Sequence, residues 1–107
     1  MEILVTEKHD QIIISIEGEI DLYNVDRLRE QINTIVDKGP SSVVIDMRNV
    51  YLIDSTVIAA LFATQKKIEA LKGQFHLANM QEAVENIIAL TGIKFKTIEL
   101  KEEGEAE

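Results

Sequence analysis

The sequence predicts a single α/β domain with a mixed, mostly parallel sheet of about five strands and helices packed against it. Short β-branched runs, which are typical of strands, alternate along the chain with segments whose apolar residues recur every three or four positions, which is typical of helices. The chain has 107 residues, 46% of them hydrophobic, which suffices for one core but not for two ordinary domains. We therefore expect a single domain over residues 1–100 and an acidic tail over residues 101–107.

The first part of the chain is typical of a hairpin followed by a helix. Two β-prone runs, residues 3–5 and 12–16, flank a polar turn and predict the hairpin. Asn24 is a suitable N-cap for the helix that follows, and the Gly-Pro pair at 39–40 is expected to end it. The apolar stripe of this helix is Val25, Leu28, Ile32, Ile35 and Val36.

The middle of the chain predicts a central strand and a second helix. Residues 42–47 form a near-continuous apolar run, which favours a strand covered on both faces, and residues 48–54 are expected to be a loop. The helix after this loop should end near Gly73. Its predicted stripe is Val57, Ala60, Leu61, Thr64, Ile68 and Leu71, with Gln65 beside or behind it.

The last third predicts a strand, a helix and a final strand. Residues 74–78 form the strand, Asn79 is the expected cap of the helix, and Gly92 should terminate it. The final β-prone piece covers residues 95–100. The packing face of the helix is predicted to contain Ala83, Val84, Ile87, Ile88 and Leu90.

Three polar residues, Asp54, Ser55 and Thr56, stand where the strand pattern changes to the second helix. Open α/β sheets present their sites at this carboxyl edge. The side chains have two interpretations, because they can cap the first helical turn or be offered to a partner. The positive end of the helix dipole also favours a phosphate on either hydroxyl. On the residues alone, capping is the more common role.

Composition excludes several classes of protein. The net charge of −8 opposes binding to nucleic acid or to an anionic membrane. The chain has no cysteine, which suits a reducing cytosol. The N-terminus lacks the pattern of a signal peptide, and the longest apolar run is far below the roughly 20 residues that span a bilayer. We therefore expect a soluble, cytoplasmic protein that does not insert into membranes.

The sequence offers no support for catalysis. No nucleophile elbow surrounds Ser55, and no phosphate-binding loop ending in Gly-Lys-Ser or Gly-Lys-Thr occurs. His9 is interpreted as a turn residue and His76 as an ordinary strand residue, because neither has a nucleophile or second acid assigned to it. We expect no enzyme activity, no cofactor and no metal site.

Four segments carry a resemblance to a known family. In order, they are residues 18–21 (Gly-Glu-Ile-Asp), 43–47, 53–56 (Ile-Asp-Ser-Thr), and 77–79 followed by 90–93 (Leu-Thr-Gly-Ile). Over residues 16–93 the chain resembles the STAS family, in particular the anti-sigma factor antagonists. The resemblance implies that the anti-sigma factor, itself a serine kinase, binds the unphosphorylated chain and phosphorylates Ser55, with Thr56 as second choice. Binding would release the sigma factor, and phosphorylation would end it.

The resemblance also implies a surface around the phosphoacceptor, formed by Asp21, Tyr23, Asp54, Ser55, Thr56, Val57 and Ile58. Asp21 has two compatible interpretations, as a turn residue that binds its own loop and as an acid close to Ser55. The family usually has Gly-Leu-Gly after the hydroxyl pair, where this chain has Val57-Ile58-Ala59. Glycine lets a partner's backbone approach closely, whereas valine does not. A phosphatase is a further candidate partner, and the sequence does not fix the oligomeric state.

Two other functions remain open from the sequence. The chain is alternatively a STAS regulatory module of a transporter or signalling complex, with the loop from Asp54 to Thr56 as a nucleotide or anion pocket. It is otherwise a scaffold subunit in which Ser55 is only a helix cap.

Overall fold

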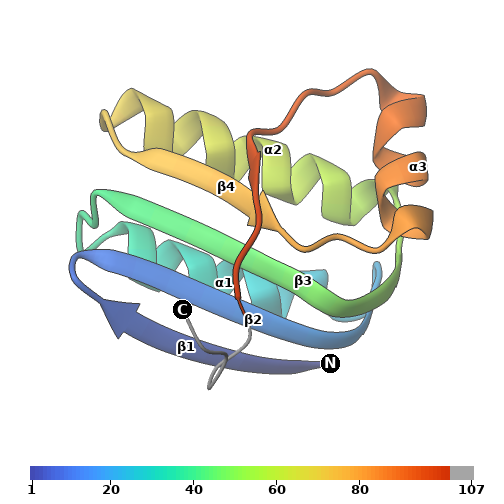
Figure 1. Ribbon diagram of the computed structural model, residues 1–107, viewed down its shortest axis with the longest axis horizontal. Coiled ribbons are helices and arrows are strands. Elements are labelled where there is room, and N and C mark those ends of the chain that lie inside the picture. Colours follow the sequence, from blue (N-terminus) through green and yellow to red (C-terminus); the bar gives the residue numbers. More distant parts are fainter. Residues whose placement is uncertain (102–107) are drawn as a thin grey trace.

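The computed structural model describes residues 1–101 and shows one five-stranded sheet with three helices (Figure 1). The predicted fold class and order of elements are confirmed. Of the predicted acidic tail, only Lys101 lies within the described residues. The elements are β1 (Glu2–Lys8), β2 (Gln11–Ile20), α1 (Val25–Val36), β3 (Ser42–Ile53), α2 (Ser55–Ala70), β4 (Gln74–Ala78), α3 (Glu82–Thr91) and β5 (Thr97–Ile98).

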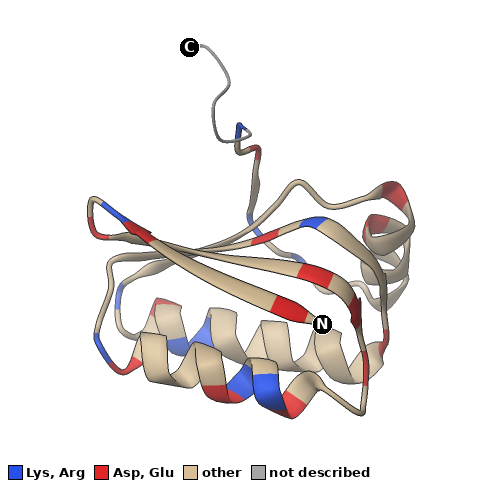
Figure 2. Cartoon of the chain, turned by 90° about the horizontal axis from the view of Figure 1, so that it is seen from below, with Lys and Arg blue, Asp and Glu red and all other residues tan. Residues whose placement is uncertain are grey.

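The strands lie in the sheet in the same order as in the chain, from β1 to β5. β1 pairs with β2 in antiparallel orientation, as the predicted hairpin requires, and the other three pairings are parallel. Helices α1 and α2 cover one face of the sheet, whereas the segment around β5 crosses the opposite face (Figures 1 and 2). Because β2 and β3 are parallel neighbours, their carboxyl ends lie at the same edge of the sheet, where β2 leads into α1 and β3 leads into α2.

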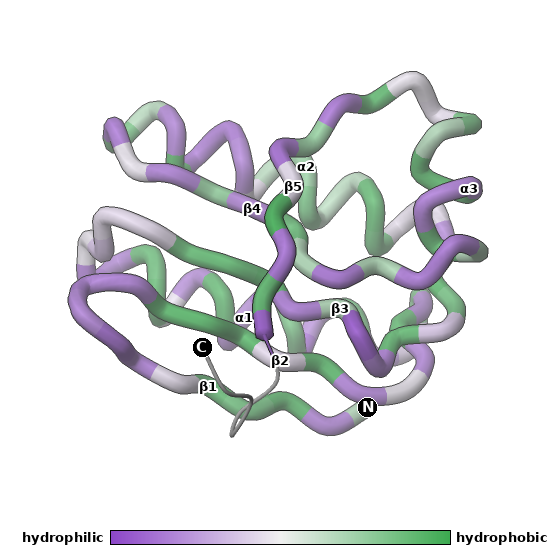
Figure 3. Tube along the Cα trace, viewed as in Figure 1, coloured by the Kyte–Doolittle hydropathy of each residue, from purple (hydrophilic) through white to green (hydrophobic). Residues whose placement is uncertain are grey.

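The core lies between the sheet and α1 and α2. Inward residues of the central strands, such as Ile14, Ile45 and Leu77, are fully buried. All five residues of the stripe predicted for α1 are also buried. Figure 3 shows the hydrophobic residues gathered along β2 and β3. This burial fixes the two helices against the sheet and so fixes where they begin.

Strands β2 and β3 are longer than the sequence predicts. The expected loop over residues 48–54 is wrong, because β3 continues to Ile53 and pairs with β2 as far as Ile20. Two shifts of register interrupt this pairing near Gly18, which has a φ of +105° and so a backbone that favours glycine. At each shift β3 has one residue more than β2, so the alternating pattern that marks a strand is broken along β3, and this hid its extension from sequence reasoning.

Four helical positions differ from the predicted stripes, and one of them is Ala83 in the first turn of α3, which is exposed rather than packed. Gln65 of α2 is buried rather than turned outward, and its side-chain amide donates to the Lys94 carbonyl at 3.1 Å. Leu71 lies just beyond α2 and is 62% exposed, and Leu90 of α3 is 89% exposed. Both leucines lie at or beyond a helix end, where the core no longer faces them.

Asn79 does not cap α3 as predicted. The N-cap position belongs to Gln81, whose side chain makes no capping hydrogen bond. Asn79 instead binds the backbone of Leu100, accepting from its N–H at 3.0 Å and donating to its carbonyl at 3.1 Å. The Arg48 guanidinium donates to the same carbonyl at 2.6 Å. These contacts hold the C-terminal segment over β3 and β4. Gly92 does terminate α3, in the left-handed conformation.

None of the helices described in residues 1–101 combines the length and the apolar character that crossing a membrane demands.

Candidate functional site

The candidate site lies where the β2–α1 and β3–α2 junctions meet. The Leu22 N–H donates to Oδ2 of Asp54 at 2.9 Å, and this bond links two loops that are 32 residues apart in sequence. Asp21, next to Leu22, therefore lies beside the Asp54 loop. The parallel pairing of β2 and β3 explains this arrangement, because both strands end at the same edge.

Asp54 is the N-cap of α2. Its Oδ1 accepts from the backbone N–H of Thr56 at 3.0 Å and of Val57 at 3.2 Å, and from the Thr56 hydroxyl. The hydrogen bond from that hydroxyl is the largest influence that lowers the pKa of Asp54, and it acts with the backbone N–H donors against partial desolvation. The carboxylate is therefore ionised at neutral pH and occupied by four donors.

The two candidate phosphoacceptors have different surroundings. Ser55 is the first residue of α2 and is exposed, and its hydroxyl makes no hydrogen bond to any other residue of the described chain, 1–101. Thr56 is half-buried, and its hydroxyl donates to Asp54. Of these two hydroxyls, only that of Ser55 is both accessible and without an intramolecular partner in the described part of the chain.

The β2–α1 loop is held by its own side chains. Oδ1 of Asp21 accepts from the Tyr23 N–H at 2.9 Å, which is the local turn predicted for this acid. Asn24 occupies the N-cap position of α1 but makes no side-chain capping bond. Its Oδ1 accepts from the Asp21 N–H at 2.9 Å, and its Nδ2 donates to the Glu19 carbonyl at 3.0 Å. The loop thereby presents Tyr23, which is 92% exposed.

Exposed apolar side chains surround this edge, and sequence reasoning identified only some of them. Leu22 is 62% exposed, Tyr51 53% and Leu52 49%. Tyr51 and Leu52 come from the end of β3, which the sequence assigned to a loop. The Tyr51 hydroxyl donates to a carboxylate oxygen of Glu19 at 3.3 Å, and the negative charge of Glu19 raises the pKa of Tyr51. We call Leu22, Tyr23, Tyr51 and Leu52 the apolar rim.

Two residues predicted to contact a partner are buried instead. Val57 is 0% and Ile58 2% exposed, because both point from the first turn of α2 into the core. This corrects the expectation that their side chains belong to a binding surface. Val57 consequently adds no exposed surface beside Ser55, although it replaces the glycine that the family usually has there.

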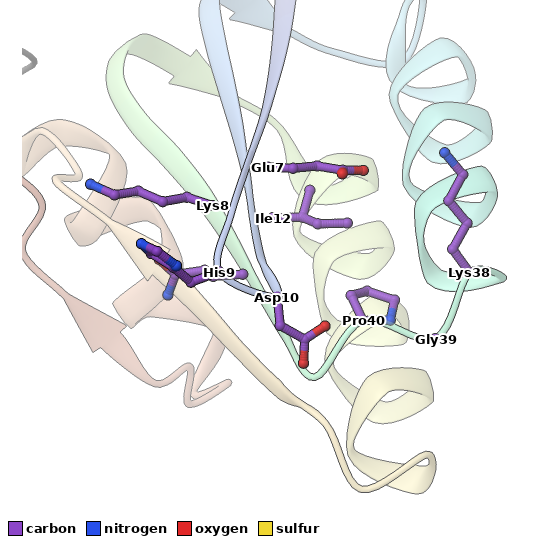
Figure 4. A pocket seen from close by; sticks show the side chains of 9 residues that line it. Glu7, Lys8, His9, Asp10, Ile12, Lys38, Gly39 and Pro40 are labelled. Atoms are coloured by element: carbon purple, nitrogen blue, oxygen red, sulfur yellow. The ribbon is translucent and has the colours of Figure 1, made fainter.

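A pocket of about 420 Å³ lies at the other end of the strands, away from Asp54 (Figure 4). It is formed by the β1–β2 turn and the segment after α1, and it brings together charges of both signs. No group of three or more His, Asp or Glu side chains within residues 1–101 is placed to hold a metal ion. The lining residues are Glu7, Lys8, His9, Asp10, Gln11, Ile12, Lys38, Gly39 and Pro40.

Comparison with known proteins places the chain in a family. The STAS domain model matches residues 2–104. The anti-sigma-B factor antagonist of Bacillus subtilis is 30% identical over 90 residues, which are 84% of this chain and 82% of the relative. The crystal structure of an anti-sigma factor antagonist from Mycobacterium paratuberculosis matches this one with a TM-score of 0.78, over 85% of this chain and 77% of that one. The two sequences are 30% identical.

The fold is also that of SpoIIAA, a Bacillus cell fate determinant whose structure is known in the phosphorylated form. The TM-score is 0.76 at 18% identity, over 95% of this chain and 94% of that one. Since the family model spans nearly the whole chain and two antagonists are 30% identical over most of their length, the chain belongs to the STAS-domain family and, within it, to the anti-sigma factor antagonists.

Proposed function

We propose that the chain is an anti-sigma factor antagonist controlled by phosphorylation of Ser55. In this proposal, the unphosphorylated form binds an anti-sigma factor that is a serine kinase, in the cytoplasm, and the sigma factor is released. The kinase then transfers a phosphoryl group to Ser55, and binding ends. The chain acts as a binding partner and as a substrate, without catalysis of its own.

The observation that carries this proposal is the division of roles between Asp54 and Ser55. Asp54 caps α2 and engages the Thr56 hydroxyl, so Ser55 is not needed as a cap. Ser55 is nevertheless exposed at the head of the helix, with a hydroxyl that no other residue within 1–101 binds. An accessible hydroxyl of this kind suits a kinase better than the half-buried hydroxyl of Thr56.

The surroundings of Ser55 explain how a phosphate would act. Phosphorylation adds about −1.5 to −2 charge at neutral pH. The ionised Asp54 lies next to Ser55, and Asp21 lies in the loop that Asp54 binds. A partner that covers the apolar rim removes water from this edge, where like charges cost several kcal/mol. The phosphate is therefore expected to be tolerated in the free protein, at the positive end of α2, but not in the complex.

The relatives support the same proposal. SpoIIAA has been solved as a phosphorylated protein, so a member of this fold carries that modification. The Bacillus subtilis relative is an antagonist of the anti-sigma-B factor, and an anti-sigma factor is the class of partner proposed for this chain. By this likeness, we infer that the partner of this chain is an anti-sigma factor, and a phosphatase is the enzyme that would restore binding.

A capture experiment tests the proposal. Wild type, Ser55→Ala, Ser55→Asp and the control Asn33→Asp are immobilised and exposed to lysate of the native cells from which ATP has been depleted, so that wild type is not phosphorylated during capture. Asn33 is exposed in the last turn of α1, so its substitution adds the same single charge away from Ser55. We expect wild type, Ser55→Ala and Asn33→Asp to retain an ATP-binding kinase, and Ser55→Asp to lose it. Equal retention by Ser55→Ala and Ser55→Asp would remove the mechanism.

A second measurement assigns the phosphoacceptor. The captured kinase is incubated with wild type, Ser55→Ala and Thr56→Val in the presence of ATP, and phosphopeptides are mapped by mass spectrometry. Phosphate should appear on Ser55 in wild type and in Thr56→Val, and be absent from Ser55→Ala. Phosphate on Thr56 in wild type would move the switch to the second candidate.

The alternative of a nucleotide or anion pocket in the loop from Asp54 to Thr56 has less support. The pocket of about 420 Å³ lies at the opposite end of the strands. Asp54 already uses its carboxylate for four donors and places a negative charge at the loop. A ligand at one hundred times its dissociation constant adds about 2.7 kcal/mol of stability, so a thermal shift with nucleotides would reveal such a site.

A further inference from the structure

Strand β1 forms one edge of the sheet (Figure 1). All seven of its residues pair with β2 in an unbroken register, from Glu2 opposite Glu17 to Lys8 opposite Gln11. Within residues 1–101, no strand pairs with its other side. Leu4, in the middle of β1, is 66% exposed. A long, regular and partly apolar edge of this kind is a template for pairing with another strand.

The hairpin turn determines which backbone groups of β1 are free. His9 and Asp10 have φ of 51° and 66°, the left-handed pair of a two-residue type I′ turn. Such a turn closes on a hydrogen-bonded pair, here Lys8 and Gln11. Hydrogen-bonded pairs alternate along an antiparallel ladder. The N–H and C=O groups of Ile3, Val5 and Glu7 therefore point away from β2 and are available to another chain.

The charges on β1 favour pairing with β1 of a second copy of the chain. Glu2 and Lys8 lie at its two ends, on the same face because they are an even number of residues apart (Figure 2 shows charges at both ends). If two copies pair in antiparallel orientation with Val5 opposite Val5, Glu2 of each copy lies opposite Lys8 of the other. The same register places each exposed Leu4 opposite Thr6 and uses all the free groups of Ile3, Val5 and Glu7.

We propose that β1 is a self-association surface, through which two copies of this chain form a two-fold dimer with one continuous sheet. A two-fold interface requires a self-complementary patch, and this register of β1 meets that requirement in backbone hydrogen bonds and in charge. Opposite charges placed directly across a strand pair are stabilising, whereas like charges there are destabilising.

The dimer would leave the phosphorylation site accessible. Strand β2 of one copy runs antiparallel to β2 of the other, so the two carboxyl edges, each with its Ser55, lie at opposite ends of the shared sheet. The proposal therefore does not depend on the phosphorylation switch, and either can fail while the other stands.

Sedimentation equilibrium over a range of protein concentrations tests the dimer. The decisive variant is Val5→Pro, which removes an outward N–H and keeps the pairing with β2, since proline is accepted on the free side of an edge strand. Wild type should show a monomer–dimer equilibrium, and Val5→Pro should remain monomeric. The denaturation midpoint of Val5→Pro reports whether the variant is folded.

Charge variants give a second test that leaves the backbone unchanged. Lys8→Glu places like charges at both ends of the interface and should raise the dissociation constant by about tenfold. Adding Glu2→Lys to it restores opposite charges and should return the constant to within about threefold of wild type. The control Lys38→Glu makes the same change in net charge at an exposed residue outside β1 and should have little effect.

Each result decides the proposal. Wild type that stays monomeric up to about 1 mM overturns it, because weaker association is not a specific interface. A dimer that survives in folded Val5→Pro, or that weakens equally in Lys8→Glu and Lys38→Glu, places the contact elsewhere and also overturns it. Weaker dimerisation of Lys8→Glu, with recovery when Glu2→Lys is added, supports the proposed register.

Discussion

The two junctions at the candidate site begin their helices in different ways. At the β3–α2 junction, Asp54 caps its own helix and also binds the Leu22 N–H of the neighbouring loop. At the β2–α1 junction, Asn24 holds the N-cap position but uses its side-chain amide to bind Asp21 and Glu19 behind it. The residue type favoured at a helix start is present in both, but only Asp54 acts as a side-chain cap.

This difference shows that the site depends on one carboxylate. Asn24 can be lost without removing a capping bond from α1, because it makes none. Asp54 joins the cap of α2, the Thr56 hydroxyl and the β2–α1 loop, so its loss disturbs all three at once. Ser55, between these contacts, is the residue that can change without affecting stability. The substitutions below test this ranking.

The largest effect is expected for Asp54→Ala. It removes the cap of α2 and the acceptor of the Leu22 N–H, and should lower the free energy of unfolding by about 2 kcal/mol. Urea denaturation measures the loss, and amide exchange should show that Leu22 is less protected. Asp54→Asn keeps a neutral acceptor and should lose less. A loss below 0.5 kcal/mol for Asp54→Ala, on the scale of an ordinary surface substitution, would contradict this central role.

The stability contributed by Asp54 should depend on pH. Its pKa in the folded protein is lowered from the ordinary value of 3.8, so the unfolded state binds more protons between the two values. The contribution is complete above about pH 5 and is lost as the pH falls through the folded pKa. Denaturation of wild type and Asp54→Asn between pH 7 and 2 measures the difference, which should shrink as the pH falls. A constant difference would show that the charge of Asp54 does not matter.

A smaller effect is expected for Asn24→Ala. The variant loses two partly exposed hydrogen bonds of the β2–α1 loop, which together contribute about 1 kcal/mol. Asn24→Asp keeps the acceptor for the Asp21 N–H and should recover part of this loss. Since Asn24 makes no capping bond, the helical circular dichroism signal should stay unchanged. A decrease in that signal would mean that Asn24 stabilises α1 after all.

Thr56→Val tests the hydrogen bond that contributes most to the lowered pKa of Asp54. The substitution keeps the shape of the side chain and removes its hydroxyl, so the pKa of Asp54 should rise towards its ordinary value. Carboxyl titration by NMR measures this change, and the stability should fall by about 0.5 to 1 kcal/mol. An unchanged titration would show that the backbone donors alone hold the carboxylate.

The smallest effect is expected for Ser55→Ala. Its hydroxyl has no partner elsewhere in residues 1–101, so the stability should change by less than about 0.5 kcal/mol, as for ordinary surface substitutions. Thermal and urea denaturation measure it. A loss near 1 kcal/mol would favour the simple interpretation of Ser55 as a helix cap and would weaken the comparison with Asp54.

The sequence predicts the buried faces well and the ends of elements poorly. The stripe of α1 is correct at every position because a core faces the whole helix. Leu71 and Leu90 continue the apolar spacing of α2 and α3 but lie exposed at their ends, because periodicity identifies a face without showing what covers it. The extra residues of β3 at its two register shifts with β2 likewise interrupt the strand pattern, and this concealed the part of β3 that carries Tyr51 and Leu52 to the site.

Contacts between distant segments account for the other differences. Asn79 has the side chain of a helix cap, but Leu100, 21 residues later, needs partners for its backbone and receives them from Asn79. Gln65 is polar and yet buried, because the Lys94 carbonyl accepts from it. In the site itself, the sequence correctly predicts that Asp54 can cap α2, but it does not show that Asp54 also binds Leu22.

The order of the strands also bears on how the protein is made. Since β1 to β5 follow each other in the sheet as they do in the chain, each new strand leaving the ribosome finds its neighbour already synthesised. Domains emerge from the N-terminus at about 5 to 20 residues per second. The sheet can therefore grow outward from the first hairpin during translation, and no strand has to insert between two that are already paired.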